Sequence, residues 1–197
     1  YIYYQNGDYF NTLKFARKFQ TLYPKNENIA YIDFLIAMTF YEQVQIVARD
    51  QTYTKAALKE FKNIIKKYPK SKYAKESELK IDLINEQLAG KHMYLARFYM
   101  KKSKWISAIK RLNIILEKYP ETIYTIEALH RLVEIYYKLG NVSLAKKYAA
   151  TLGYNFNDSD WYKKTYKVVA DQNYQEDTKA TKLKLRDKIK NIFKLSK

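Results

Sequence analysis

Residues 103–120 read SKWISAIKRLNIILEKYP, and this stretch decides the fold. Small and large apolar side chains recur in it at steps of three, four and three residues, at Trp105, Ala108, Leu112 and Ile115. Such steps place the side chains on one face of a helix, where a small residue lets a neighbouring helix approach closely. Pro120 then ends the helix, because a proline cannot continue it. The stretch predicts the second half of a helix pair.

The same arrangement recurs along the chain. All three prolines follow a tyrosine, in Leu22-Tyr23-Pro24, Lys67-Tyr68-Pro69 and Lys118-Tyr119-Pro120. A fourth copy starts at the Gly140 turn and has Asn157 where the proline would stand. Internal repeats of helix pairs with a turn and a closing proline are typical of tetratricopeptide (TPR) repeats. We therefore predict an all-α protein, a TPR-like helical-repeat solenoid, that is, a superhelix of antiparallel helix pairs.

The intervals between the prolines are longer than a minimal two-helix unit of about 34 residues. We assign the extra residues of the second repeat to 42–51, between its two helices. Those of the third repeat predict one unusually long helix over 72–100, since this stretch has no proline and one glycine. The predicted TPR-like domain covers 1–170, and we expect it to be N-terminally truncated. It contains repeats at about 1–24, 26–69, 72–120 and 122–157 and a capping helix at 159–170, and a basic C-terminal tail at 171–197 follows it.

Composition narrows the function classes. Four glycines and three prolines are too few for the turns of β-sandwiches, barrels or Rossmann folds. The net charge is +17, but only six of the 37 basic residues are arginine. This excess fits acidic lipid headgroups or an acidic partner, and it also fits compositional bias and solubility. The basic tail is either a solvated segment or a basic amphipathic helix.

Nothing in the sequence points to catalysis. The absence of cysteine excludes thiol chemistry, cysteine-based zinc sites and disulfides. His92 and His130 have no metal-ligand partner at helical spacing, and the four glycines form no phosphate-binding loop. We therefore expect a non-enzymatic binding protein without a metal or cofactor.

The repeat register also predicts a binding groove. In such arrays the first helix of each repeat lines a concave surface, so residues offset from the packing positions point into it. Methionine and aromatic side chains there suit an extended, partly apolar peptide. The alternative is that Ile32 and Ile36 are buried beneath segment 42–51. In the fourth repeat the same register selects His130, Glu134, Tyr137 and Lys138. The candidate peptide groove comprises Tyr4, Ile32, Ile36, Thr39, Met93, Arg97 and Met100.

Three further stretches resemble one known family. Residues 49–52 read Arg-Asp-Gln-Thr, residues 88–99 lie within the predicted long helix, and residues 152–162 run from the end of the last repeat into the capping helix. Together with the long-helix spacing they are similar to the BamD (ComL) family, the TPR lipoprotein component of the outer-membrane β-barrel assembly (BAM) complex. The resemblance covers about residues 1–170.

This resemblance implies a scaffold that binds the POTRA domains of BamA, and unfolded outer-membrane proteins for insertion into the membrane. Other Bam lipoproteins are further candidate partners, and nucleic acid is not one. The family is held at the periplasmic face of the outer membrane of Gram-negative bacteria by an acylated N-terminal cysteine, and these 197 residues include no cysteine. On this basis we expect the BamA surface at Arg111, Lys138, Lys146 and Lys147.

Two alternatives to this function remain open at the level of sequence. One is another periplasmic TPR adaptor, for example in cell-wall synthesis, which has no reason to contain residues 49–52 or the long helix. The other is an RNA-binding helical-repeat protein, suggested by a pI of about 9.6 and 21 tyrosines. The scarcity of arginine argues against RNA, since arginine makes the bidentate contacts such proteins favour.

Overall fold

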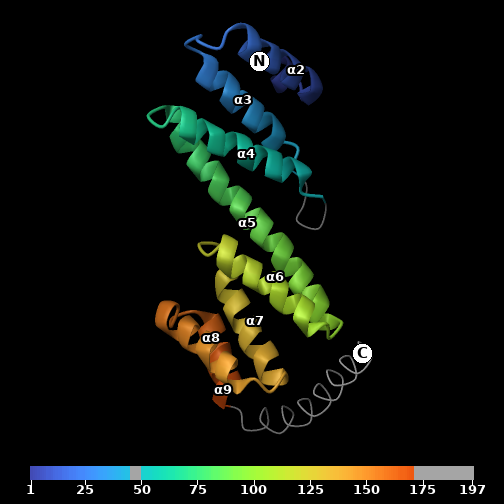
Figure 1. Cartoon of the computed structure of the whole chain (residues 1–197), viewed down its shortest axis with the longest axis vertical. Coiled ribbons are helices and arrows are strands. Elements are labelled where there is room, and N and C mark those ends of the chain that lie inside the picture. Colours follow the sequence, from blue (N-terminus) through green and yellow to red (C-terminus); the bar gives the residue numbers. More distant parts are fainter. Residues whose placement is uncertain (45–49, 171–197) are drawn as a thin grey trace, which may run out of the picture. The chain divides into compact units, whose positions relative to one another are not determined.

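The computed structural model describes residues 1–44 and 50–170. Within these residues every regular element is a helix, which confirms the predicted all-α fold. The helices are coloured in chain order in Figure 1. Their bounds are α1 Ile2–Gln5, α2 Tyr9–Leu22, α3 Ile29–Tyr41, α4 Thr52–Lys67, α5 Lys72–Lys101, α6 Trp105–Lys118, α7 Tyr124–Lys138, α8 Val142–Asn155 and α9 Asp160–Ala170.

These bounds confirm several predicted helix ends. Helices α2, α4 and α6 each stop directly before the tyrosine of a Tyr-Pro pair. The long helix predicted over 72–100 is α5, and the capping helix predicted over 159–170 is α9. Helix α3 ends at Tyr41 and α4 begins at Thr52, and residues 45–49 between them lie outside the described residues. The division into four repeats and a tail stays a prediction, and the tail at 171–197 lies outside the described residues.

The helix ends share one geometry. Tyr23, Tyr68 and Tyr119 cap α2, α4 and α6 with φ between −135° and −131° and ψ between 46° and 55°. This conformation lies outside the helical region, which a following proline disfavours. Phe156 caps α8 at φ −144° and ψ 42° without a proline after it. The aromatic residue is therefore the shared feature of all four ends, and the proline is an addition at three of them.

The turns between paired helices also repeat. Gly7, Ser103 and Gly140 have φ values of 71°, 52° and 73°, each two residues before a helix starts. After each of them a backbone N–H reaches back to the carbonyl of the preceding helix, as in Asn141 N to Tyr136 O at 2.8 Å. This left-handed turn with a reverse hydrogen bond is the Schellman arrangement that satisfies the last carbonyls of a helix.

The chain divides into two compact units, Tyr1–Lys91 (unit 1) and His92–Lys197 (unit 2), and the boundary falls within α5. In unit 1 helix α3 packs against both α2 and α4. The rings of Phe34 and Phe61 lie 5.9 Å apart in this core. Asp33 is buried on α3, where its carboxylate accepts hydrogen bonds from Gln20 of α2 and from the hydroxyl of Tyr68, at 3.0 Å. One buried carboxylate thus ties α2, α3 and the end of α4 together.

Unit 2 is built on α7, which packs against α6, α8 and α9. The repeat pattern supplies its core, since Ala108, Leu112 and Ile115 are fully buried. Val133 of α7 and Ala145 of α8 are buried in a second cluster, beside the stacked rings of Tyr136 and Tyr148. The small residues predicted at helix crossings lie where two helices meet.

Candidate functional site

An open pocket lies among α1, α2 and α3 in unit 1. Its volume is about 200 Å³. We call it the aromatic pocket, and it is lined by Tyr1, Tyr3, Thr12, Phe15, Ala16, Phe19, Ile32 and Leu35. Thr12, Ala16 and Leu35 are buried, so they form the floor. The rest of the lining is aromatic or aliphatic, which suits the side chain of an apolar ligand.

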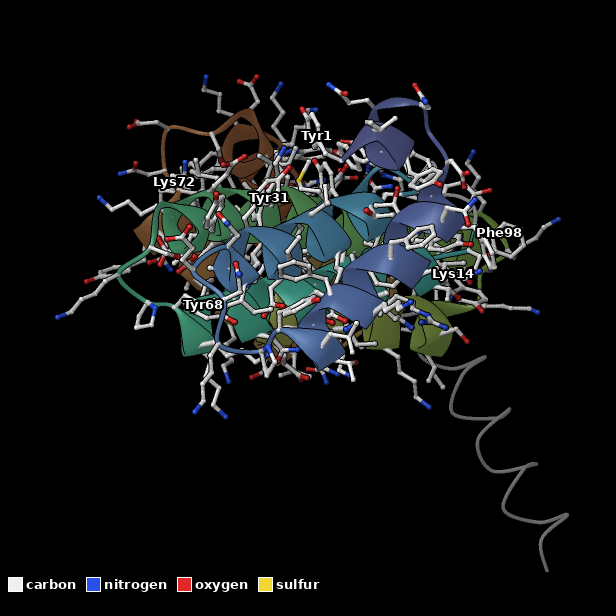
Figure 2. All side chains as sticks on the ribbon, turned by 90° about the horizontal axis from the view of Figure 1, so that it is seen from above. Tyr1, Lys14, Tyr31, Tyr68, Lys72 and Phe98 are labelled. Carbon is white, nitrogen blue, oxygen red and sulfur yellow. The ribbon has the colours of Figure 1, made fainter. Side chains whose placement is uncertain are left out.

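The rim of the aromatic pocket is exposed. The rings of Tyr3 and Phe15 stack with their centroids 5.3 Å apart and their planes 6° from parallel, and 43% and 46% of these side chains remain accessible. Tyr1 is 65% exposed, and Phe10 of α2 is 77% exposed nearby in the sequence. Figure 2 looks onto this end of unit 1 and labels Tyr1 and Lys14. So much exposed apolar surface is typical of a binding site.

Only part of the predicted groove in unit 1 coincides with the aromatic pocket. Ile32 lines it, but Ile36 and Thr39 have no exposed surface. The Thr39 hydroxyl instead donates to the carbonyl oxygen of Leu35 at 2.7 Å. The prediction that these two residues line the groove is therefore wrong. They are core residues, because α3 packs against both α2 and α4. Ile36 is thus buried and Ile32 is partly buried, while residues 45–49 of the segment named in the alternative lie outside the described residues.

Tyr4 lies beside the aromatic pocket rather than in it. Its hydroxyl donates to Glu42 Oε1 at 3.3 Å, which joins α1 to the end of α3. Burial, followed by the charge and hydrogen bond of Glu42, raises the pKa of Tyr4 to about 12. Tyr4 therefore stays neutral, and its described contacts are structural.

The candidate groove residues of unit 2 do not form an open apolar surface either. Met93 is fully buried, which corrects its assignment to the groove, and Met100 is half-buried. Arg97 is half exposed at its side chain, but its guanidinium binds the Glu127 carboxylate with both Nε and Nη2. Tyr137 is also buried, so it too is corrected to a core position.

Glu127 is the centre of an ion-pair network on α7. Its side chain is 6% exposed and also accepts from Arg131 Nε at 3.2 Å. Arg131 in turn donates a hydrogen bond from Nη1 to Glu134 Oε2 at 2.8 Å, which extends the network. Burial alone raises the pKa of Glu134, but hydrogen bonds from His130 and Arg131 outweigh it and lower that pKa to about 2. Both carboxylates therefore stay ionised at neutral pH, as partners of basic residues rather than as proton donors.

His130 attaches α9 to α7. Its ring is buried, with Nδ1 2.7 Å from Thr165 Oγ1 and Nε2 3.5 Å from Glu134 Oε1. The Trp161 ring lies 5.0 Å from the His130 ring. Since both nitrogens and one face of the ring are occupied, His130 holds the capping helix in place, and its assignment to the groove is corrected.

The four basic residues expected to meet BamA all lie in unit 2, on α6, α7 and α8, which pack in that order. Arg111 is partly exposed on α6, and within the described residues no hydrogen bond or ion pair occupies its guanidinium. The Lys138 ammonium lies 5.3 Å from the centre of the Trp105 ring. Lys146 and Lys147 are exposed on α8. Their role as a BamA surface stays a prediction.

Tyr3, Phe15 and Phe19 line the aromatic pocket without having been predicted from the sequence. The repeat register assigns the groove only to the first helix of each repeat, whereas Phe15 and Phe19 lie on α2, the second helix of its pair. The sequence did contain a signal for this site, because Phe15 and Phe19 are four positions apart and so lie on one face of the helix. Phe15 is not a packing position of the repeat.

The described part of the chain offers no group of three histidine or acidic residues placed to hold a metal. None of the helices in residues 1–44 and 50–170 is both long and apolar enough to cross a bilayer.

Comparison with known proteins identifies the family. The model of the YfiO family, described as outer membrane lipoprotein, matches residues 1–152. Outer membrane protein assembly factor BamD of Rickettsia prowazekii is 41% identical over 169 residues, 86% of this chain and 66% of the relative. The protein of the same name from Caulobacter vibrioides is 39% identical over 87% of this chain and 56% of its own length. The chain thus spans less than two thirds of these relatives. With a match over most of its length, the chain belongs to the YfiO family of outer membrane lipoproteins, together with proteins named BamD.

Proposed function

We propose that this chain is a non-enzymatic adaptor in outer-membrane protein assembly, holding an unfolded substrate with unit 1 and the BamA POTRA domains with unit 2. Its relatives carry the name assembly factor, and it belongs to a family of outer membrane lipoproteins. The observation that carries the proposal is the open aromatic pocket, since it offers a binding surface without catalytic groups.

The aromatic pocket suits one kind of ligand. Unfolded outer-membrane proteins alternate apolar and polar residues along each strand, and aromatic residues are common at the membrane interfaces. A single aromatic side chain fits a pocket of about 200 Å³, and the stacked rings of Tyr3 and Phe15 can pack against it. The substrate would therefore be held as an extended segment by an aromatic anchor.

The proposed contact with the BamA POTRA domains depends on Arg111. A guanidinium that is partly exposed and has no partner among the described residues can bind a carboxylate in a bidentate pair. Arg97 and Arg131 cannot do so without giving up Glu127. Lys138, Lys146 and Lys147 would add charge around this pair and speed the encounter with an acidic surface.

The mechanism needs no covalent chemistry. A scaffold that binds two molecules at separate sites makes their meeting intramolecular and raises the concentration of one near the other. The proposed location is the periplasmic face of the outer membrane in a Gram-negative bacterium, with a lipid anchor outside these 197 residues and other Bam lipoproteins as further partners.

The first experiment titrates the chain against purified BamA POTRA domains. We expect micromolar or tighter binding for the wild type and at least a tenfold loss for Arg111→Glu, because a charge pair becomes a repulsion. Lys167→Glu on α9 is the control for charge, since this exposed lysine is outside the proposed surface. Absence of wild-type binding would refute the partner, and binding unchanged in Arg111→Glu would refute the site.

The second experiment titrates a peptide from the C-terminal strand of an outer-membrane protein, ending in an aromatic residue. Phe15→Ser should weaken binding by roughly tenfold, since removing a central aromatic contact costs more than about 1 kcal/mol. Phe10→Ser is the matched control, because Phe10 is more exposed and does not line the aromatic pocket. Equal loss in both variants would mean that the peptide adheres to exposed aromatic surface without using the pocket.

A further inference from the structure

One face of α4 carries charge of a single sign. Beyond Thr52 and Tyr53 in its first turn, each exposed position of α4 is a lysine, at Lys55, Lys59, Lys62, Lys66 and Lys67. Lys67 differs from the others, because its ammonium lies 3.4 Å from the buried Asp33 carboxylate. The other four, which we call the lysine stripe, have no ion-pair partner among the described residues.

The lysine stripe is narrow and straight. Its members follow one another at steps of four, three and four residues, so at about 100° per residue they lie within an arc of about 60°. From Lys55 to Lys66 the stripe runs about 16 Å along the helix. Glu60, the acidic residue of α4, lies outside this arc and pairs with Arg17 of α2. Lys55 interacts electrostatically with the Asp50 carboxylate just before α4, and no ion pair among the described residues neutralises the other three lysines.

This arrangement opposes the stability of the helix. Like charges three or four residues apart on a helix repel one another. Lys55 is also in the first turn, where the helix dipole disfavours a positive charge. A face built this way is destabilising in the free protein, and a bound anionic surface would relieve the repulsion.

Compositional bias does not account for the stripe, because it would place lysine on every exposed face. The exposed positions of α6 are Ile106, Lys110, Glu117 and Lys118, and those of α9 include Asp160 and Tyr166. On α2 the exposed positions include Phe10, Phe15 and Thr21. The exposed positions of α4 as a whole also include Thr52 and Tyr53, so the feature that distinguishes α4 is the run of four lysines within one narrow arc.

We propose that the lysine stripe binds the anionic headgroups of a lipid bilayer. The stripe contains lysine and no arginine or aromatic residue, so it lacks the groups that recognise a carboxylate bidentately or stack on nucleobases. Lysine ammonium groups instead attract a diffuse layer of negative charge without fixed geometry. The family description, outer membrane lipoprotein, places a bilayer within reach. The inference rests on the proposed location at a membrane, and on neither binding site.

The test measures sedimentation of the full chain with vesicles of phosphatidylcholine, with or without phosphatidylglycerol. The test variant replaces the four stripe lysines with glutamine (Lys55→Gln, Lys59→Gln, Lys62→Gln, Lys66→Gln). The control variant carries the same net charge and has four exposed lysines from four other segments replaced (Lys18→Gln, Lys25→Gln, Lys110→Gln, Lys167→Gln). Glutamine keeps the helix propensity of lysine, and circular dichroism checks that both variants fold.

We expect the wild type to bind the phosphatidylglycerol vesicles and not those of phosphatidylcholine alone. The stripe variant should bind at least about tenfold more weakly, and the control variant within about twofold of the wild type. Equal loss in the two variants would mean that net charge alone drives adsorption, and the proposal would fail. Tighter, stripe-dependent binding to a single-stranded RNA or to polyglutamate at the same salt concentration would also overturn it. None of these outcomes depends on the POTRA or peptide titrations.

Discussion

Ser103 occupies a position that favours glycine. Its φ of 52° lies in the left-handed region, where the equivalent turns have Gly7 and Gly140. A side chain at such a position brings Cβ close to the following carbonyl, which costs roughly 1 kcal/mol. Within residues 1–44 and 50–170 no other non-glycine residue has positive φ. The structure of unit 2 therefore holds Ser103 in a conformation that this residue does not favour.

Ser103→Gly should accordingly stabilise the protein. We expect the free energy of unfolding to rise by about 0.5–1 kcal/mol, measured by urea denaturation. Gly140→Ser is the reciprocal change and should lower it by a similar amount, since Gly140 has the same conformation, at φ 73°. A neutral or destabilising effect of Ser103→Gly would show that the left-handed backbone at Ser103 is not strained relative to the turn at Gly140.

Helix α9 depends on charge for its attachment to α7. His130 contacts Thr165 and Trp161 of α9, and Glu134 in turn lies beside His130 on α7. The Arg131 guanidinium of α7 also lies 5.2 Å from the centre of the Trp161 ring, whereas the Lys164 ammonium 4.2 Å from that centre belongs to α9 itself. The capping helix is thus held by a small set of polar and cation–π contacts in addition to apolar packing.

The attachment should weaken in acid. Burial opposes ionisation of Glu134, but its hydrogen bonds lower its pKa from 4.5 to about 2, so folding favours the ionised form. That contribution is complete above a pH of about 4.5 and is lost as the pH falls toward about 2, by up to about 3 kcal/mol. Denaturation of the wild type between roughly pH 6 and pH 2 should show this loss. Glu134→Gln should be less stable at neutral pH and lose less in acid. An unchanged slope would contradict the assignment.

The sequence predicted the helices better than the sites. Steps of three and four residues identify helices and their packing faces, and Tyr-Pro marks their ends, because these are local effects. They could not separate core from groove on α3, which is apolar at most positions on every side and packs against both α2 and α4. Nor could they reveal that Arg97 pairs with Glu127, 30 residues away, since that pairing depends on how α5 and α7 meet.

At the scale of the whole molecule, the two proposed binding functions fall in different units. Tyr3, Phe15 and Ile32 belong to unit 1, whereas Arg111 and Lys138 belong to unit 2. No residue is shared between the two surfaces. The proposed function therefore predicts a division of labour between the units.

Point variants should therefore separate the two functions. Phe15→Ser should leave the affinity for POTRA domains within about twofold, and Arg111→Glu should leave peptide binding equally unaffected, since substitutions at independent sites that share no residue are additive. Isothermal titration of each variant with each ligand gives all four values. If either variant weakens both ligands by the same factor, the sites are coupled or the variant is misfolded, and the division of labour fails.

The aromatic cap of α4 should slow the opening of the last turn of this helix. The final turn of a helix ordinarily frays and exchanges its amide protons fast. At the end of α4, the Tyr68 N–H bonds to the Ile64 carbonyl at 2.8 Å while the Tyr68 hydroxyl is held by buried Asp33. Opening that turn requires breaking a buried contact as well as a backbone bond. Hydrogen exchange should thus be slower at the Tyr68 amide than at the Phe156 amide, which makes the same backbone bond at the end of α8 but belongs to a residue whose side chain has no hydroxyl.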